Sequence, residues 1–315
     1  MSGGIRAGDG ALLVDKPAGP TSHDVVARVR KLFHARTVGH TGTLDPFATG
    51  LLVLVLGAAT RLARWAERRR KVYRATVRLG QTTTTDDLTG SLVAERTPAE
   101  WPSLVAVGDA LAGLTGTQHQ RPPAYSAKLI AGVRSYRLAR KATVEASAAA
   151  EGAVGGGEGT RPMELPRAVE VTVYRLELVE YRPPLVTLRA EVSPGTYLRA
   201  VGRDLGDALG TGAHLTELRR EQVGSWRVAD AHPLVALTGG EPLLPVETLV
   251  DELPRVPLGP DEARAARHGR DVVRPDAVED EAALCEGDRL VAVARRVTGG
   301  WHPAVVLPEG APAAP

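Results

Sequence analysis

The chain has 315 residues, of which 43% are hydrophobic and 24% charged, and its formal net charge is +2 at pH 7. These values are those of soluble globular proteins, and the length exceeds that of one ordinary domain. The longest purely apolar run is short and no apolar signal region opens the chain, so we expect a cytoplasmic protein without a membrane span. The single cysteine, Cys285, excludes an internal disulfide and a cysteine-ligated metal cluster.

The chain begins with a predicted strand over residues 11–16, followed by a turn. A helix is predicted next, because apolar residues recur at helical spacing. Either Thr21 or Ser22 is placed to cap this helix, and Asp24 stands in the capping-box position relative to Thr21. The apolar residues of this helix are Val25, Val26, Val29, Leu32 and Phe33.

Two further strands and a loop are predicted in the next stretch. Residues 51–56 form an apolar run that ends at Gly57, which is typical of a buried strand. Residues 72–79 alternate as a strand does. Gly80 and Gln81, followed by four threonines and two aspartates, predict a loop.

A long strand with a slip in register is predicted over residues 169–178, with its partner over 186–192. The following helix places Leu198, Val201, Leu205 and Leu209 on one face. Before these elements, residues 146–159 are rich in alanine and glycine and predict a disordered loop.

The proline-rich residues 242–260 indicate a domain boundary, and two short strands are predicted around Gly299 and Gly300 within residues 289–307. The fold class that follows is α+β, with a mixed, mostly antiparallel sheet, flanking helices and a small C-terminal β-rich domain. We expect a first domain over residues 1–245 and a second over 250–315.

One segment, GHTGTLDPFATG over residues 39–50, holds a single carboxylate, Asp45, among backbone-shaping residues. Pro46 biases the backbone of Asp45 toward the extended region, and the glycines permit tight turns. The segment leads directly into the buried strand from residue 51, so we expect Asp45 on a stiff loop anchored by the core. The alternative is a structural aspartate that caps a turn.

The chemistry of this segment is restricted by what surrounds it. One acid does not make a glycoside-hydrolase pair, and the histidines lack metal-ligand spacing. The sequence contains no phosphate-binding, dinucleotide-binding, serine-hydrolase or zinc-protease motif. A lone carboxylate acting as nucleophile or as electrostatic stabiliser remains.

Positive charge gathers around this segment. Between Arg28 and Arg78 twelve lysines or arginines stand against two acids, whereas residues 276–288 are acidic. A basic part of this kind favours a nucleic-acid partner, and Tyr73 among Arg68 to Arg74 combines an aromatic face with cations. The alternative is a solvated helix face.

Five ordered motifs carry a family resemblance. GHTGTLDPFATG closely resembles the catalytic motif of the TruB family of tRNA pseudouridine-55 synthases. The segments VDKPAGPTSHDVV, KVYRATVRLGQTTTTDDLTG, RPPAYSAKLIAGVRSYRLAR, and SPGTYLRAVGRDLG with GAHLTELRR are similar to its other motifs, in the same order. Together they cover residues 12–220.

This resemblance implies the pseudouridine synthase fold with a PUA-like C-terminal domain. It also implies an RNA-gripping segment at about residues 121–141, and residues 146–159 are an insertion between that segment and the strand from residue 169. The implied activity is isomerisation of uridine-55 in the TΨC stem-loop of tRNA. A monomer without metal, cofactor or obligatory protein partner is implied as well.

The resemblance assigns roles to residues by motif. Asp45 is implied as the nucleophile, Arg199 as its ionic partner and Tyr73 as a stacking residue that is also a candidate for taking the C5 proton. His40 is implied to hold the target base out of the stack. The implied pocket wall is Tyr197 and Leu218, and the supporting residues are Lys16 and Asp87.

For each role the sequence also permits an alternative without a catalytic or binding function. The sequence fits these alternatives: His40 can be an ordinary loop histidine, and Tyr73 and Leu218 can be core residues. Arg199 can be a surface arginine, and Lys16 can be structural or contact RNA. Two other functions also stay open. One is an RNA-folding chaperone that uses the same surface without chemistry, and the other is a dyskerin-type synthase that works with guide RNA and protein partners.

Overall fold

The computed structural model describes residues 8–123, 129–130, 133–134 and 167–308. The chain forms two compact units: the first consists of Met1–Arg69 and Arg220–Pro315, and the second of Arg70–Arg219. The chain therefore leaves the first unit and returns to it. The sequence predicts two domains, over residues 1–245 and 250–315. That division into domains stays a prediction.

The first unit is built around two long antiparallel strands, β1 (Gly10–Lys16) and β3 (Thr49–Leu56). β14 (His232–Pro233) pairs parallel with β1, and β2 (Val38–His40) pairs antiparallel with β3. Both long strands are almost wholly buried, because each contains an apolar run, residues 11–14 in β1 and 51–56 in β3. The predictions over residues 11–16 and 51–56 are confirmed.

Between these strands lies α1 (Ser22–Leu32), which buries Val25, Val26 and Val29. Thr21 is its N-cap and forms a reciprocal capping box with Asp24. The predicted capping box is confirmed, and of the two candidate caps Thr21 is the one used. After β3 the chain continues through a 3-10 helix, η1 (Gly57–Leu62), and α2 (Ala63–Glu67).

The C-terminal part of the first unit carries a five-stranded sheet in the order β15-β17-β18-β19-β16. Its predicted hairpin within residues 289–307 is confirmed by β18 and β19, with Gly299 in the turn at φ 83°. α6 (Pro260–Arg267) packs on this sheet. The strands are β15 (Arg255–Pro257), β16 (Val272–Val273), β17 (Glu281–Glu286), β18 (Arg289–Val297) and β19 (Gly300–Val306).

The core of the first unit joins residues far apart in the sequence. Leu13 and Val53 of the long strands and Trp65 of α2 share one apolar cluster with Cys285 and Val293 of the C-terminal sheet. Burial of this kind stabilises the fold by roughly 25 cal/mol per Å² of apolar surface. Short elements complete the unit: β13 (Trp226–Arg227), η2 (Val228–Asp230), η3 (Leu234–Ala236) and η4 (Val246–Leu249).

The second unit holds an antiparallel sheet in the order β12-β4-β11-β10-β7. The predicted pair over 169–178 and 186–192 is confirmed by β10 and β11, and the expected slip appears as register shifts in β10. The strands are β4 (Lys71–Leu79), β7 (Gly116–Gln120), β10 (Val169–Arg182), β11 (Leu185–Val192) and β12 (Ala213–Val223), of which residues up to 219 belong to this unit.

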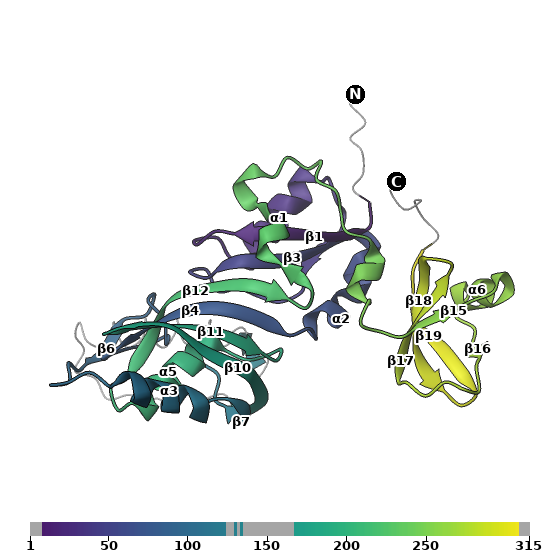
Figure 1. Ribbon diagram of the computed structural model, residues 1–315. Helices are drawn as coiled ribbons and strands as arrows, with labels where there is room; N and C mark the ends of the chain where they lie inside the picture. The colour runs from purple at the N-terminus through teal and green to yellow at the C-terminus, as the bar shows by residue number, and fades with distance from the viewer. Residues whose placement is uncertain (1–7, 124–128, 131–132, 135–166, 309–315) are drawn as a thin grey trace, which may run out of the picture. The chain divides into compact units, whose positions relative to one another are not determined.

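Two helices, α3 (Leu104–Gly113) and α5 (Leu198–Ala208), lie beside one another against this sheet (Figure 1). α5 confirms the predicted helix and buries Leu198, Val201 and Leu205. A Cβ atom at its Gly206 would lie 2.3 Å from the amide nitrogen of Ala213, so glycine is needed where the helix approaches β12.

The predicted loop after Gly80 is partly a strand. β5 (Gln81–Thr83) pairs with β6 (Leu92–Glu95), and the threonines and aspartates between them form the turn. The expectation missed β5 because threonine suits strands as well as turns. A two-residue pair, β8 (Leu129–Ile130) with β9 (Val133–Arg134), is described within the segment predicted to grip RNA.

The rest of that segment beyond residue 134 and the whole of 146–159 lie outside the described residues. In the described part of the chain, no helix has both the length and the hydropathy to cross a bilayer. The fold is α+β with mostly antiparallel strand pairing, as the sequence predicts.

Candidate active site

Asp45 lies in the loop of residues 41–48 that joins β2 to β3, and its side chain is half-buried. Gly42 near the start of the loop and Gly50 just after its end, in β3, have backbones that disfavour other residues, with φ of 139° and 99°. A Cβ atom at Gly50 would lie 2.3 Å from the carbonyl oxygen of Arg220. The loop therefore depends on glycine for both its conformation and its close packing.

Lys16, at the end of β1, holds the loop just after Asp45. Its Nζ donates to the carbonyl oxygens of Pro17 at 2.9 Å, Pro20 at 2.8 Å and Pro46 at 3.2 Å. The residue is fully buried, and burial lowers its pKa from 10.5 to about 8 even though Asp45 acts to raise it. At neutral pH it keeps its proton, so an ammonium with three N–H groups meets three acceptors.

Ser22, the first residue of α1, holds the loop just before Asp45. Its hydroxyl donates to the carbonyl oxygen of Leu44 at 3.2 Å and accepts from the Leu44 amide at 2.9 Å. Gly19 adds a bond from its amide to the carbonyl oxygen of Pro46 at 2.8 Å. Both neighbours of Asp45 in the chain are thus fixed by hydrogen bonds, so the stiff loop expected from the sequence has a physical cause.

A third clamp comes from Arg220 on β12, which is 2% exposed. Its guanidinium donates to the carbonyl oxygen of Leu51 at 2.6 Å from Nε, of Gly42 at 3.0 Å from Nη2 and of Thr43 at 3.5 Å from Nη1. The sequence argument passed over Arg220, although it lies in the motif that contains Leu218. The signal that it offered was an arginine at an alternating strand position beside apolar residues.

His40, at the end of β2, is half-buried, and its pKa is lowered to about 4, mainly by burial and further by His23 and Arg220. The His23 ring stands edge-on to it, with centroids 5.5 Å apart. The Gly42 amide donates to Nδ1 of His40 at 3.3 Å, which requires a neutral ring with its proton on Nε2. His40 is therefore an uncharged donor at physiological pH.

Arg199 in the second unit is 5% exposed, so the alternative that it is a surface arginine is wrong. It lies in the first turn of α5, whose N-cap is Tyr197. Its Nη1 donates to the carbonyl oxygen of Thr85 at 2.9 Å and lies 3.4 Å from Oδ2 of Asp87. A buried cation of this kind needs such partners to offset its desolvation.

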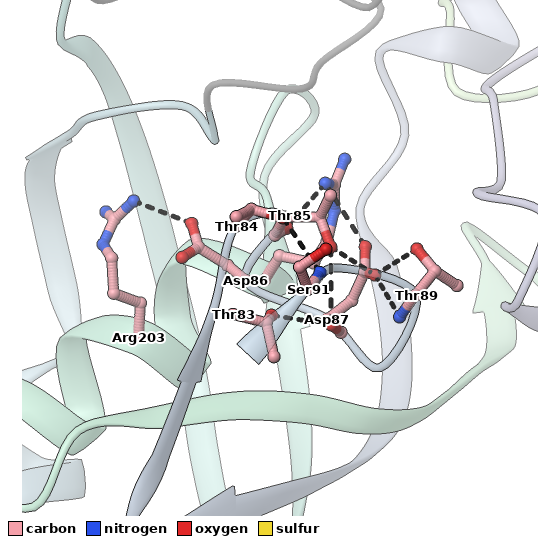
Figure 2. Close-up of polar contacts among 9 residues, drawn as sticks. Thr83, Thr84, Thr85, Asp86, Asp87, Thr89, Ser91 and Arg203 are labelled. Carbon is pink, nitrogen blue, oxygen red and sulfur yellow. Dashed lines mark hydrogen bonds and ion pairs between the residues drawn. The ribbon is translucent and has the colours of Figure 1, made fainter. Parts of the chain in front are cut away.

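Asp87 stands at the centre of a hydroxyl-rich turn (Figure 2). Its Oδ1 accepts from the Thr85 hydroxyl at 2.7 Å, the Thr89 amide at 2.9 Å and the Thr89 hydroxyl at 2.5 Å. Figure 2 also shows Arg203 reaching the neighbouring Asp86, 3.2 Å from its Oδ2. Burial raises the pKa of Asp86, whose backbone is left-handed at φ 58°. The turn therefore holds Asp87 rigidly against Arg199.

The remaining predicted site residues lie on the framework of the second unit. Tyr73 on β4 and Leu218 on β12 are each 7% exposed. Tyr197 is half-buried, and its backbone is tied to the side chain of Gln120 by bonds of 2.8 and 3.1 Å. For Tyr73 and Leu218, burial fits a pocket wall and a core position equally well.

The predicted site residues divide between the two units. The first unit brings together Lys16, His40 and Asp45, and the second brings together Asp87 and Arg199. The joint arrangement of the two groups, and with it the predicted pair of Asp45 and Arg199, stays a prediction. The structural alternative for Lys16 matches its contacts, because its ammonium group faces backbone carbonyls inside the first unit.

The basic run around Tyr73 is largely engaged with the protein itself. Arg69 is buried against the Trp226 ring and Asp251, and Lys71 is buried as well. Arg68 pairs with Glu281 and Arg70 with Glu191, at 2.7 and 3.2 Å. The interpretation of this whole run as RNA-binding cations is therefore wrong for Arg69 and Lys71, because the side chains of these two residues are buried inside the protein.

Other cationic side chains in the first unit are exposed to solvent. Arg28 and Lys31 are exposed on α1, three residues apart and so on one face of the helix. Arg36 is exposed after it. Within the described part of the chain, these three side chains form no ion pair. We call these three residues, two on α1 and one just after it, the α1 basic face.

Comparisons with known proteins agree with this architecture. The family model "TruB family pseudouridylate synthase (N terminal domain)" matches residues 30–153, and "tRNA pseudouridylate synthase B C-terminal domain" matches 199–251. A tRNA pseudouridine synthase B of Thermobifida fusca is 42% identical over 309 residues, covering 95% of this chain and 98% of that protein. One of a Mycobacterium species is 43% identical, covering 91% and 92%.

Among solved structures, a chain of an H/ACA ribonucleoprotein bound to a substrate RNA containing 2′-deoxyuridine has the same fold. Its TM-score is 0.70 at 23% identity, and the match covers 95% of this chain and 85% of that one. The class that fold and relatives define is the pseudouridine synthase, an isomerase. Within that class, the chain belongs to the TruB family.

Proposed function

We propose that this enzyme converts uridine-55 in the TΨC loop of tRNA to pseudouridine, with Asp45 as the nucleophile. The tRNA substrate is supported by the names of relatives that match nearly the whole chain at 42–43% identity. The observation that carries the proposal is the clamped Asp45 loop: hydrogen bonds fix Leu44 and Pro46, on either side of the only carboxylate in that segment.

The reaction needs no redox change. The bond from ribose C1′ to uracil N1 breaks, the base turns, C1′ joins C5, and the proton on C5 is lost while N1 gains one. A carboxylate that attacks the substrate divides this rearrangement into two steps. It must be ionised and well placed, and each condition has support in the first unit.

Ionisation of Asp45 is favoured by a buried cation. The Asp45 carboxylate raises the pKa of Lys16, and the same attraction stabilises the charged carboxylate. Placement is favoured by the loop, because a reacting group held in one orientation removes part of the entropic cost of the reaction. We propose that Arg199, already buried with Asp87, completes the site as the ionic partner of Asp45.

The target base has to leave its stack before C1′ and C5 are reached, which costs a few kcal/mol. We propose that Tyr73 stacks on the flipped uracil and takes the C5 proton, and that Tyr197 and Leu218 wall the pocket. One stacked aromatic ring recovers about 1–3 kcal/mol. Neutral His40 donates from Nε2 and so assists in holding the nucleotide out.

For the phosphates of the RNA we propose the α1 basic face of Arg28, Lys31 and Arg36. Phosphate contacts need cations whose charge is not already neutralised by the protein. α1 also supplies Ser22, so the helix that fixes the Asp45 loop carries two of the cations, Arg28 and Lys31, among its exposed residues.

Tritium release from tRNA labelled at C5 of uridine tests this function. Wild-type protein is expected to release about one equivalent per tRNA, and none when the TΨC-loop uridine is replaced. Asp45→Asn keeps the shape of the side chain but loses the nucleophile, so it should bind tRNA and release no tritium. Near-normal turnover by Asp45→Asn would remove Asp45 from the role of nucleophile.

Two other outcomes separate the alternatives. If wild-type protein binds and refolds tRNA but releases no tritium, the chaperone role is indicated. Release that appears only when a guide RNA and partner proteins are added would indicate the dyskerin-type enzyme.

A further inference from the structure

We propose that Arg220 is a positioning residue for the reaction, which sets the place of Asp45 by joining the start of the 41–48 loop to the strand that follows it. This inference rests on the function proposed above, in which Asp45 is the reacting carboxylate. Arg220 does not itself contact the reacting atoms in this proposal. It acts through the backbone that carries Asp45.

The first argument is the pattern of its hydrogen bonds. Gly42 and Thr43 lie at the start of the loop and Leu51 is the third residue of β3, and the guanidinium donates to all three carbonyl oxygens. A guanidinium carries five donors in a rigid planar fork, so one side chain can fix several acceptors in a set geometry. A single ammonium on a flexible stem lacks that geometry.

The second argument is the fit of the backbone. Gly50 has no side chain, and a Cβ atom there would lie 2.3 Å from the carbonyl oxygen and 2.8 Å from the amide nitrogen of Arg220. The loop therefore packs directly on the main chain of Arg220, while its carbonyls bind the side chain. Two independent features of the loop are matched to the same residue.

The third argument is that Ser22, Lys16 and Arg220 bind different parts of the loop. Ser22 and Lys16 hold Leu44 and Pro46, the immediate neighbours of Asp45. Arg220 alone among these three holds the start of the loop and the strand after it, including Gly42, whose φ of 139° is a conformation that most residues avoid. Loss of Arg220 should thus leave the loop attached but free to shift as a whole.

Electrostatics support the closeness of these groups. Arg220 acts to lower the pKa of Lys16 and of His40, so its charge is felt on both sides of the loop. A buried charge without partners would strongly destabilise the fold, and the three carbonyls supply those partners.

Arg69 is the matched control. It is likewise buried in the first unit, and it donates to a backbone carbonyl, that of Thr248, and to Asp251. Neither contact belongs to the Asp45 loop. Arg69→Gln should lower stability much as Arg220→Gln does, so that general destabilisation and loss of positioning can be told apart.

The experiment compares Arg220→Gln, Arg220→Lys and Arg69→Gln with wild type by single-turnover rate, tRNA Kd and hydrogen exchange of the peptide over residues 41–51. A misplacement of about 1 Å in a reacting group lowers rates on the order of a hundredfold, so we expect a loss of that size in Arg220→Gln. Its Kd for tRNA should stay within about threefold of wild type. The substitution affects the placement of Asp45 and therefore the chemical step, whereas the phosphate contacts that we propose for binding are made by other residues.

Arg220→Lys should recover a minor part of the rate, and Arg69→Gln should keep the wild-type rate despite a lower Tm. Exchange in the 41–51 peptide should rise in the Arg220 variants and not in Arg69→Gln. If Arg220→Gln does not fold, Arg220→Lys, which keeps the buried charge, decides the matter with the same measurements.

A folded Arg220 variant with the wild-type rate would overturn the proposal, as would equal rate losses in the Arg220 and Arg69 variants. The exchange measurement needs no activity. Wild type that forms no pseudouridine would therefore refute the proposed function, while the loop's dependence on Arg220 would still be decided by exchange.

Discussion

Lys16 Nζ donates to the carbonyl oxygen of Pro46 over 3.2 Å, joining residues thirty positions apart in the chain. The same ammonium binds the carbonyls of Pro17 and Pro20, so one buried charge ties the turn after β1 to the loop that carries Asp45. A buried lysine is costly, and its three acceptors offset that cost only while it is protonated.

The first prediction concerns stability at alkaline pH. Burial lowers the pKa of Lys16 from 10.5 to about 8, so between these values the unfolded chain binds a proton that the native protein lacks. Stability contributed by this group therefore rises with pH through that window, by up to about 1.4 kcal/mol per pH unit. Below pH 8 both states are protonated, and the cost of burying the charge is constant.

Urea unfolding of wild type and Lys16→Met from pH 7 to 10.5 measures this effect. The difference in unfolding free energy between the two proteins should change with pH in the direction that favours wild type as pH rises. Other titrating groups cancel in the difference. A constant difference across the window would contradict a lowered pKa for Lys16.

The second prediction concerns the buried pair of Arg199 and Asp87, both 5% exposed at the side chain. Asp87→Ala removes a buried carboxylate that pairs with the Arg199 guanidinium, and it should lower the unfolding free energy by about 3–5 kcal/mol. A double-mutant cycle with Arg199→Met is expected to show strong coupling between the two.

The exposed pair of Arg175 and Glu177 in the same unit provides the comparison, with side chains 64% and 37% exposed. Its coupling should stay below about 1 kcal/mol, because solvent screens exposed pairs. Similar coupling in both pairs would mean that burial of Arg199 is not what makes its partner important.

The third prediction concerns His40, whose pKa is lowered from 6.5 to about 4. An NMR titration should place its midpoint near pH 4, with the signal assigned by its loss in His40→Asn. Because the native ring stays neutral while the unfolded one charges, this group's contribution to stability is lost as pH falls from 6.5 toward 4. A midpoint near 6.5 would show that the ring is neither buried nor close to another cation.

The fourth prediction concerns the α1 basic face. Arg28→Gln and Lys31→Gln should each weaken tRNA binding and lower the slope of log K against log salt by about 1. Both side chains are exposed, so Tm should change little.

Arg68→Gln is the matched change, because Arg68 is exposed but pairs with Glu281 at 2.7 Å. We expect its salt slope to equal that of wild type. Slopes that fall for Arg68→Gln and not for the α1 variants would move the phosphate contacts away from α1.

Much of the local structure follows from the sequence. The apolar run at residues 51–56, the capping box of Thr21 and Asp24, and the hairpin around Gly299 were all predictable. In each case a short stretch of chain contains the whole cause: apolar residues in an unbroken run, a side chain within reach of its own helix end, or a glycine at positive φ. The motif order that indicates the family is equally a property of the linear chain.

The partners of charged side chains were decided by the tertiary structure alone. In sequence Arg68, Arg69 and Arg70 form one basic run, yet one is paired at the surface, one is buried against Trp226 and one pairs with Glu191. Arg220 and Lys16 lie far from Asp45 along the chain, but their buried charges hold its loop. A residue's type fixes which bonds its side chain can make, whereas burial and strand register, which arise only on folding, fix which atoms it meets.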